Sequence, residues 1–153
     1  MAEPTPNALS RQFTGLVNRK VSFTVTKPFA PLNVEQVYGV YTVFPSQTTL
    51  VVRADLALFG SLAGALVGLP DAEVKSRLKL SLGDDLLPDA MKEVFNVSSA
   101  VLTGDGRAHF NQMVTKAVYL STEASKLMDT AIRRSCFTVD VEGYQGGRFA
   151  IFE

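Results

Sequence analysis

The sequence has very few of the residues that form disulfides and metal centres. Its 153 residues include one cysteine, Cys136, one histidine, His109, and no tryptophan. One cysteine excludes an internal disulfide, and a metal site of cysteine and histidine needs several such side chains close together. We therefore expect no metal site of cysteine and histidine in this chain. We also predict no cofactor of its own. Cys136 adjoins a β-type run and is interpreted as an unreactive core thiol, and His109 as a surface residue.

The sequence also lacks an excess of charge of one sign and a long apolar run. Lysine plus arginine and aspartate plus glutamate number 15 each, and the basic residues never gather into a stripe, so nucleic-acid binding is not indicated. Residues 54–69 are the most apolar stretch, but glycines interrupt it and it is shorter than the roughly 20 residues of a membrane span. We expect no membrane insertion. The first residues do not resemble a secretory signal, which predicts a cytoplasmic protein.

The remaining composition is that of an ordinary globular domain. Apolar residues make up 46% of the chain and charged residues 20%, which is enough apolar material for a core without disulfides. We predict a single domain over residues 1–153, in which residues 1–7, with Pro4 and Pro6, form a loose tail. No internal repeat is apparent.

Hydrophobic periodicity predicts a mixture of helices and strands. Helices are expected at residues 9–17, 56–67, 71–80, 86–102 and 122–133, and strands at residues 21–25, 37–44, 48–52, 117–120, 136–141 and 148–152. Gly60, Gly64 and Gly68 recur every four residues in one predicted helix, which indicates that another backbone segment approaches it closely. The predicted fold class is α+β, with an antiparallel sheet packed against long helices.

The helix predicted over residues 86–102 has two different faces. Its large apolar side chains fall on one arc of a helical wheel, which we expect to face the core: Leu87, Met91, Val94, Phe95, Val101 and Leu102. Asp89, Glu93, Asn96 and Ala100 follow one another at spacings that align them along the opposite side. A polar stripe of this kind is, by itself, an ordinary solvated helix face.

The order Asp89-xxx-Glu93-xx-Asn96 on an apolar-backed helix resembles the motif of the CheC/CheX family of chemotaxis phosphatases. The likeness extends over most of the chain, with a single motif as in the CheX type. It implies a phosphatase acting on a phosphorylated response regulator of the CheY type. Asn96 would orient the attacking water, Glu93 would pair with the partner's active-site lysine, and Asp89 would help to bind the partner. The Mg²⁺ ion would belong to the response regulator.

The resemblance also implies a homodimer formed through sheet edges. Residues 148–152 carry little charge and are expected to form such an edge.

Two other interpretations remain open. A non-catalytic interaction protein could dock a partner on the same helix, as related domains do in the flagellar switch. Phe95 and Ala100 favour it, because relatives often have a small residue beside the asparagine and a glycine four residues after it. The third interpretation, a small-molecule sensor domain, depends only on the apolar, glycine-rich helix over residues 56–67.

Overall fold

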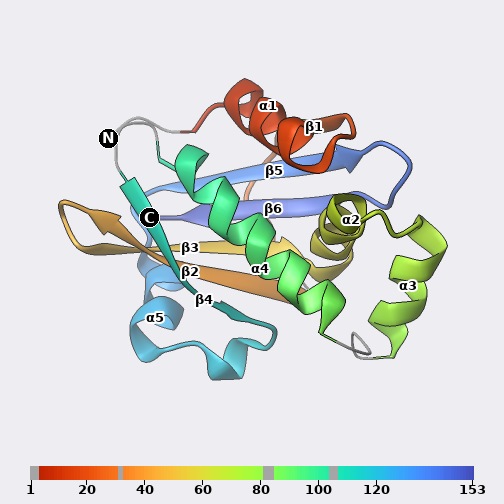
Figure 1. Ribbon diagram of the computed structural model, residues 1–153. Helices are drawn as coiled ribbons and strands as arrows, with labels where there is room; N and C mark the ends of the chain where they lie inside the picture. Colours follow the sequence, from red (N-terminus) through yellow and green to blue (C-terminus); the bar gives the residue numbers. More distant parts are fainter. Residues whose placement is uncertain (1–3, 31–32, 81–84, 104–106) are drawn as a thin grey trace.

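Six antiparallel strands form one sheet, and helices cover both of its faces (Figure 1). This computed structural model describes residues 4–30, 33–80, 85–103 and 107–153. The elements in chain order are α1 (Pro6–Val17), β1 (Val21–Val25), β2 (Gln36–Phe44), β3 (Thr48–Asp55), α2 (Leu56–Val67), α3 (Asp71–Lys79), α4 (Leu86–Ser98), the 3₁₀ turn η1 (Ser99–Val101), β4 (Arg107–Val114), the 3₁₀ turn η2 (Ala117–Tyr119), α5 (Thr122–Thr130), β5 (Arg134–Val141) and β6 (Gly147–Phe152). The predicted α+β class is confirmed.

The two halves of the chain repeat the same order of elements. A helix followed by three strands occurs as α1-β1-β2-β3 and again as α4-β4-β5-β6, where η1, η2 and α5 are inserted in the second half. β1, β2 and β3 correspond to β4, β5 and β6. When each strand is exchanged for its counterpart, the order in the sheet, β1-β5-β6-β3-β2-β4, is the same order read from the other end. Phe13 of α1 packs on Phe23 of β1, as Phe95 of α4 packs on Phe110 of β4. The topology is therefore duplicated, although the sequence shows no repeat.

Alternate side chains of the strands point to opposite faces and build two cores. The larger core lies under α1, α2 and α4, which cover one face of the sheet in Figure 1. Its buried rings are Phe13, Phe23, Tyr41, Phe59, Phe95, Phe137 and Phe149. The second core lies under α5 and contains Cys136, which is buried as predicted.

The glycines of α2 make room for α3. A Cβ atom placed on Gly60 would lie 2.9 Å from Leu78 Cδ1, and one on Gly64 would overlap Val74. Close approach is thus confirmed at these two positions, by side chains of α3 rather than by backbone. Gly68 has a different role, because its φ of 79° ends α2 in the left-handed conformation. The packing of α3 on Gly60 and Gly64 and the helix end at Gly68 explain the glycine spacing of α2, so a small-molecule site is not needed to account for it.

The terminal strand is not an edge, and that prediction is wrong. β6 lies between β5 and β3, and its last four residues are all buried. Its lack of charge reflects burial on both faces, as in an interior strand. The edge strands are β1 and β4. α1 covers the outer edge of β1, where Ser10 Oγ accepts a hydrogen bond from Phe23 N at 2.9 Å and Thr14 Oγ1 bonds both N and O of Val21.

The prediction of a strand at residues 117–120 is also wrong. This segment contains η2, and the strand of this region is β4, over residues 107–114, which was not predicted. β4 is an edge strand whose side chains are largely solvent-exposed on one face. Few apolar residues are needed there, so the sequence carries little strand signal.

Helix ends differ from the predictions by a few residues. α1 begins at Pro6, with Thr5 Oγ1 accepting from Ala8 N at 3.1 Å, inside the segment expected to be loose. Residues 1–3 of that segment lie outside the described residues. α4 ends at Ser98, and the 3₁₀ turn η1 replaces its expected last turn. No helix within the described ranges is long and apolar enough to cross a membrane.

Gly39 of β2 provides the space that α4 needs on the sheet. An ideal Cβ atom at this position would lie 2.5 Å from Cδ1 and 2.6 Å from Cε1 of Phe95. The Phe95 ring is rigid and is enclosed by other rings, so moving it away from an added Cβ atom would disturb the packing of the core.

We therefore expect Gly39→Ala to lower the free energy of unfolding by about 1–3 kcal/mol through overpacking. Gly15→Ala in α1 is the matched control, because nothing lies within 4 Å of its Cβ position, and a helical glycine replaced by alanine gains about 0.5–1 kcal/mol. Urea denaturation measures both. Adding Phe95→Leu should relieve part of the Gly39→Ala loss, and a loss that is unchanged in that background would contradict the packing argument.

Candidate functional site

α4 crosses the sheet diagonally and presents two chemically different sides (Figure 1). Leu87, Met91, Val94 and Phe95 are fully buried on the inner side. Asp89, Glu93, Asn96 and Ala100 are all exposed, the last in η1, so the predicted stripe is confirmed as one outward face. Side chains four residues apart on a helix have Cβ atoms about 5–6 Å apart, so Asp89 and Glu93 are neighbours.

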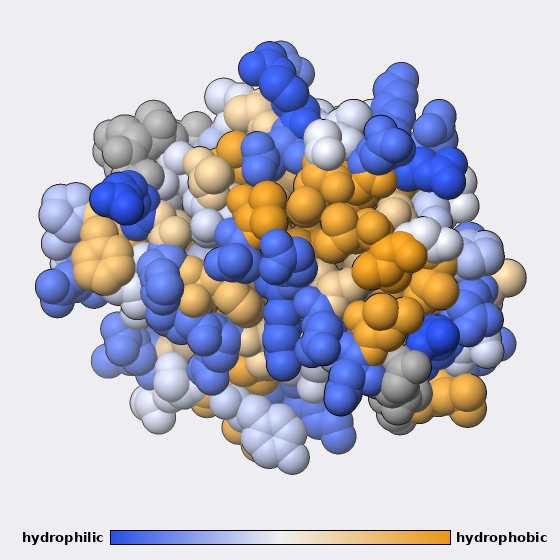
Figure 2. Space-filling view, viewed as in Figure 1, coloured by the Kyte–Doolittle hydropathy of each residue, from blue (hydrophilic) through white to orange (hydrophobic). Residues whose placement is uncertain are grey.

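The polar stripe lies beside an apolar surface. Figure 2 shows a band of hydrophilic residues along α4 and a hydrophobic patch next to it, over α2. Partly exposed apolar side chains of this region include Leu66, Val67 and Leu69. A partner that covers α4 would therefore meet charged and amide groups along one line and apolar groups along its flank.

Phe95 is adjacent to Asn96 in sequence but lies outside the exposed face. Its ring stacks on Phe59 with a centroid distance of 4.1 Å and on Phe110 at 5.6 Å. Since successive helical residues are rotated by about 100°, a buried Phe95 leaves Asn96 pointing to solvent. The bulky side chain is therefore part of the core and does not obstruct the stripe.

Side chains hold the main-chain carbonyls around Asn96. Tyr41 Oη of β2 donates to Phe95 O at 2.7 Å, and Ser98 Oγ donates to the same oxygen at 3.0 Å. Ser99 Oγ donates to Asn96 O at 2.7 Å, and Gln12 Nε2 of α1 reaches Val97 O at 3.4 Å. These side-chain donors add to the bond from the Ser99 amide to Asn96 O at the end of α4, where regular helical hydrogen bonding stops.

The three stripe side chains have no internal polar contacts within the described part of the chain. No hydrogen bond or ion pair there engages the carboxylates of Asp89 and Glu93 or the carboxamide of Asn96. Tyr41 differs, because burial raises its pKa above the usual range. Its hydroxyl therefore stays a hydrogen-bond donor while the stripe remains open to a partner.

The other candidate residues do not form a site. His109 is exposed on β4, as predicted, and Asn111 Nδ2 donates to Thr42 Oγ1 at 2.8 Å. Burial raises the pKa of the Cys136 thiol. Over the described residues, no three histidine, cysteine, aspartate or glutamate side chains are grouped so as to hold a metal ion.

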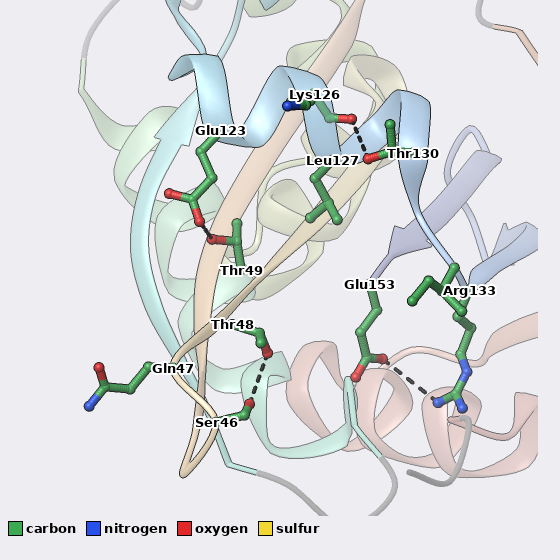
Figure 3. Close-up of a pocket in the computed structure, with 11 residues that line it drawn as sticks. Ser46, Gln47, Thr48, Thr49, Glu123, Lys126, Leu127, Thr130, Arg133 and Glu153 are labelled. Atoms are coloured by element: carbon green, nitrogen blue, oxygen red, sulfur yellow. Dashed lines mark hydrogen bonds and ion pairs between the residues drawn. The ribbon is translucent and has the colours of Figure 1, made fainter.

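Sequence reasoning gave no indication of a hollow of about 730 Å³ on the α5 side of the sheet (Figure 3). The β2–β3 hairpin, α5 and the end of β6 surround it. Several of its polar side chains pair with one another: Thr49 Oγ1 donates to Glu123 Oε1 at 2.8 Å, and Arg133 Nη1 lies 3.8 Å from Glu153 Oε2. It contains none of the stripe residues. The Tyr41 contact also escaped sequence reasoning, because it joins residues 54 positions apart.

Comparison with known proteins identifies the fold. No family model matches the sequence, and no curated protein is detectably similar to it. The FliM middle domain of H. pylori matches with a TM-score of 0.54 and 13% identity, over 96% of this chain and 84% of that one. FliY of Thermotoga maritima matches with a TM-score of 0.55 and 12% identity, over 94% and 80%.

A weaker match is a chain of the complex of CheX, CheY, BeF₃ and magnesium from Borrelia burgdorferi. Its TM-score is 0.39 and its identity 13%, over 95% of this chain and 90% of that one. The FliM and FliY domains share the CheC/CheX fold, so the fold implied by the Glu93 and Asn96 motif is confirmed. Identities this low establish the fold alone.

The burial pattern of α4 predicts sharply different stabilities for neighbouring substitutions. We expect Phe95→Ala to lower the free energy of unfolding by about 3–5 kcal/mol, because it removes a ring packed on every side. Glu93→Ala and Asn96→Ala should change it by no more than about 0.5 kcal/mol, since both side chains are exposed. Chemical denaturation compares the three variants. A loss at Asn96 as large as that at Phe95 would show that the stripe is not a free face.

Proposed function

We propose that the protein binds a phosphorylated response regulator of the CheY type through the exposed face of α4 and accelerates the loss of its phosphoryl group. The observation that carries this proposal is the placement of Glu93 and Asn96 on one exposed helix face whose backbone is fixed by the core. Side chains that project from a packed helix can enter a partner's active site while the helix stays on its own sheet.

Asn96 is the residue that we assign to the chemistry. Its carboxamide can accept a hydrogen bond from a water molecule and donate one to a phosphoryl oxygen, which fixes the water in line with the bond to be broken. Water attacks phosphorus, the bond from phosphorus to the regulator's aspartyl oxygen breaks, and inorganic phosphate leaves. Phosphoryl transfer of this kind depends on positioning and on charge stabilisation more than on a strong base. A neutral amide is therefore sufficient.

Glu93 and Asp89 serve binding in this proposal. The Glu93 carboxylate, one turn before Asn96, would pair with the lysine of the regulator's active site. Asp89 extends the acidic line by another turn. The magnesium ion would be held by the regulator's own carboxylates and would neutralise charge on the phosphoryl oxygens.

A second candidate function is a docking protein without catalysis. It is favoured by the structural matches, which include the FliM middle domain alone and FliM in a complex with FliG. The apolar patch beside α4 in Figure 2 suits a stable protein contact as well as a transient one. The two candidates share the same surface and differ in whether the phosphoryl group turns over.

Release of phosphate from candidate phosphorylated regulators distinguishes these functions. With the wild-type protein we expect faster dephosphorylation. Asn96→Ala should abolish the acceleration and keep binding, because the amide acts mainly in the transition state. Glu93→Ala should weaken binding as well, since it removes an ion pair.

Lys92→Ala is the control, because Lys92 is exposed on the same helix beside the stripe. It should behave like the wild type. If the wild-type protein binds a phosphorylated regulator but leaves its phosphate lifetime unchanged, the docking function replaces the enzymatic one.

We also propose that the protein forms a homodimer through β4. β6 is interior and α1 covers the outer edge of β1, so among the described strands only the outer edge of β4 has no such cover. Light scattering should give twice the chain mass of 16.6 kDa at micromolar concentration. A monomer at high micromolar concentration would contradict this arrangement.

A further inference from the structure

The last turn of α4, which carries Asn96, is held by side chains from other elements. In a longer helix the carbonyls of Phe95, Asn96 and Val97 would accept from amides four residues ahead. α4 ends at Ser98 and the chain tightens into η1, where the Ser99 amide donates to Asn96 O, three residues back. Side chains also donate to the carbonyls of this turn. The orientation of the turn depends on where those donors lie.

Tyr41 supplies the donor that comes from the sheet. Its side chain is fully buried, and its hydroxyl lies 2.7 Å from Phe95 O. Tyr41 belongs to β2, which is paired on both sides, with β3 and with β4. The bond therefore ties the backbone beside Asn96 to an internal strand. Ser98 Oγ shares the same carbonyl but belongs to the turn itself and cannot fix it to the sheet.

We propose that Tyr41 is a positioning residue for Asn96, whose hydroxyl fixes the last turn of α4 and thereby the direction in which the Asn96 carboxamide projects. The reason is covalent geometry: the carbonyl that Tyr41 holds forms the planar peptide unit with the Asn96 amide nitrogen. A rotation of this unit turns the Cα–Cβ bond of Asn96 with it. The inference rests on the proposed function, because it assigns the orientation of Asn96 a role in catalysis.

Tyr144 offers an internal comparison. Its hydroxyl donates to Leu69 O at 2.5 Å, just beyond the end of α2. Tyr144→Phe and Tyr41→Phe thus delete the same group from the same kind of contact, at a carbonyl near a helix end. Only Tyr41→Phe removes a hydrogen bond to the peptide unit beside Asn96. Both variants keep their rings, so ring packing such as that of Tyr41 on Phe110 is retained.

The test measures dephosphorylation kinetics and amide hydrogen exchange in the two variants and the wild type. We expect Tyr41→Phe to lower kcat about tenfold and to keep KM within about twofold, because misplacement of an orienting group acts in the transition state. Tyr144→Phe should leave both constants unchanged. Exchange at the Ser99 and Ala100 amides should be faster in Tyr41→Phe, with exchange at Met91 unaffected.

The two readouts separate the possible failures. If the wild-type protein does not accelerate dephosphorylation, the proposed function fails. The anchoring of the turn is tested separately by hydrogen exchange, and unchanged exchange at the Ser99 amide in Tyr41→Phe would overturn it. If the wild type is active and Tyr41→Phe loses no more kcat than Tyr144→Phe, the positioning role is overturned. A loss confined to KM would overturn it as well.

Discussion

The packing of Phe95 is the contact on which the arrangement of the site depends. The ring fills the space above Gly39 and stacks between Phe59 and Phe110, so it joins α4 to α2 and to two strands of the sheet. Once this side chain points inward, the helical rotation of about 100° per residue turns Asn96 outward, and Glu93 lies on the same exposed face. The hydrophobic core thereby determines which groups of α4 a partner can reach.

The first helices of the two topological halves, α1 and α4, use their polar side chains differently. In the first half, the hydroxyls of Ser10 and Thr14 on α1 bond the backbone of β1 and close that edge of the sheet. In the second half, Glu93 and Asn96 make no such contacts among the described residues. These two hydroxyls of α1 are thus committed to the sheet edge, whereas Glu93 and Asn96 of α4 are open to a partner.

Much of the fold and the face of α4 could be predicted from the sequence, because they follow from local periodicity. The apolar arc of α4 and the β2–β3 hairpin depend on neighbouring residues, and both predictions are confirmed. β4 could not be found, since an exposed edge strand needs few apolar residues. The placement of β6 inside the sheet and the bond of Tyr41 to Phe95 O depend on distant segments, which no local pattern specifies.

In the function proposed above, a phosphorylated regulator binds the exposed stripe of α4. Titrating the isotope-labelled protein with a regulator activated by beryllofluoride, and following the backbone amide resonances, tests it most directly. We expect the largest changes in chemical shift at Asp89, Glu93 and Asn96 and at the apolar flank around Leu66. Changes concentrated instead around the hollow next to α5, with the amides of α4 unperturbed, would contradict it.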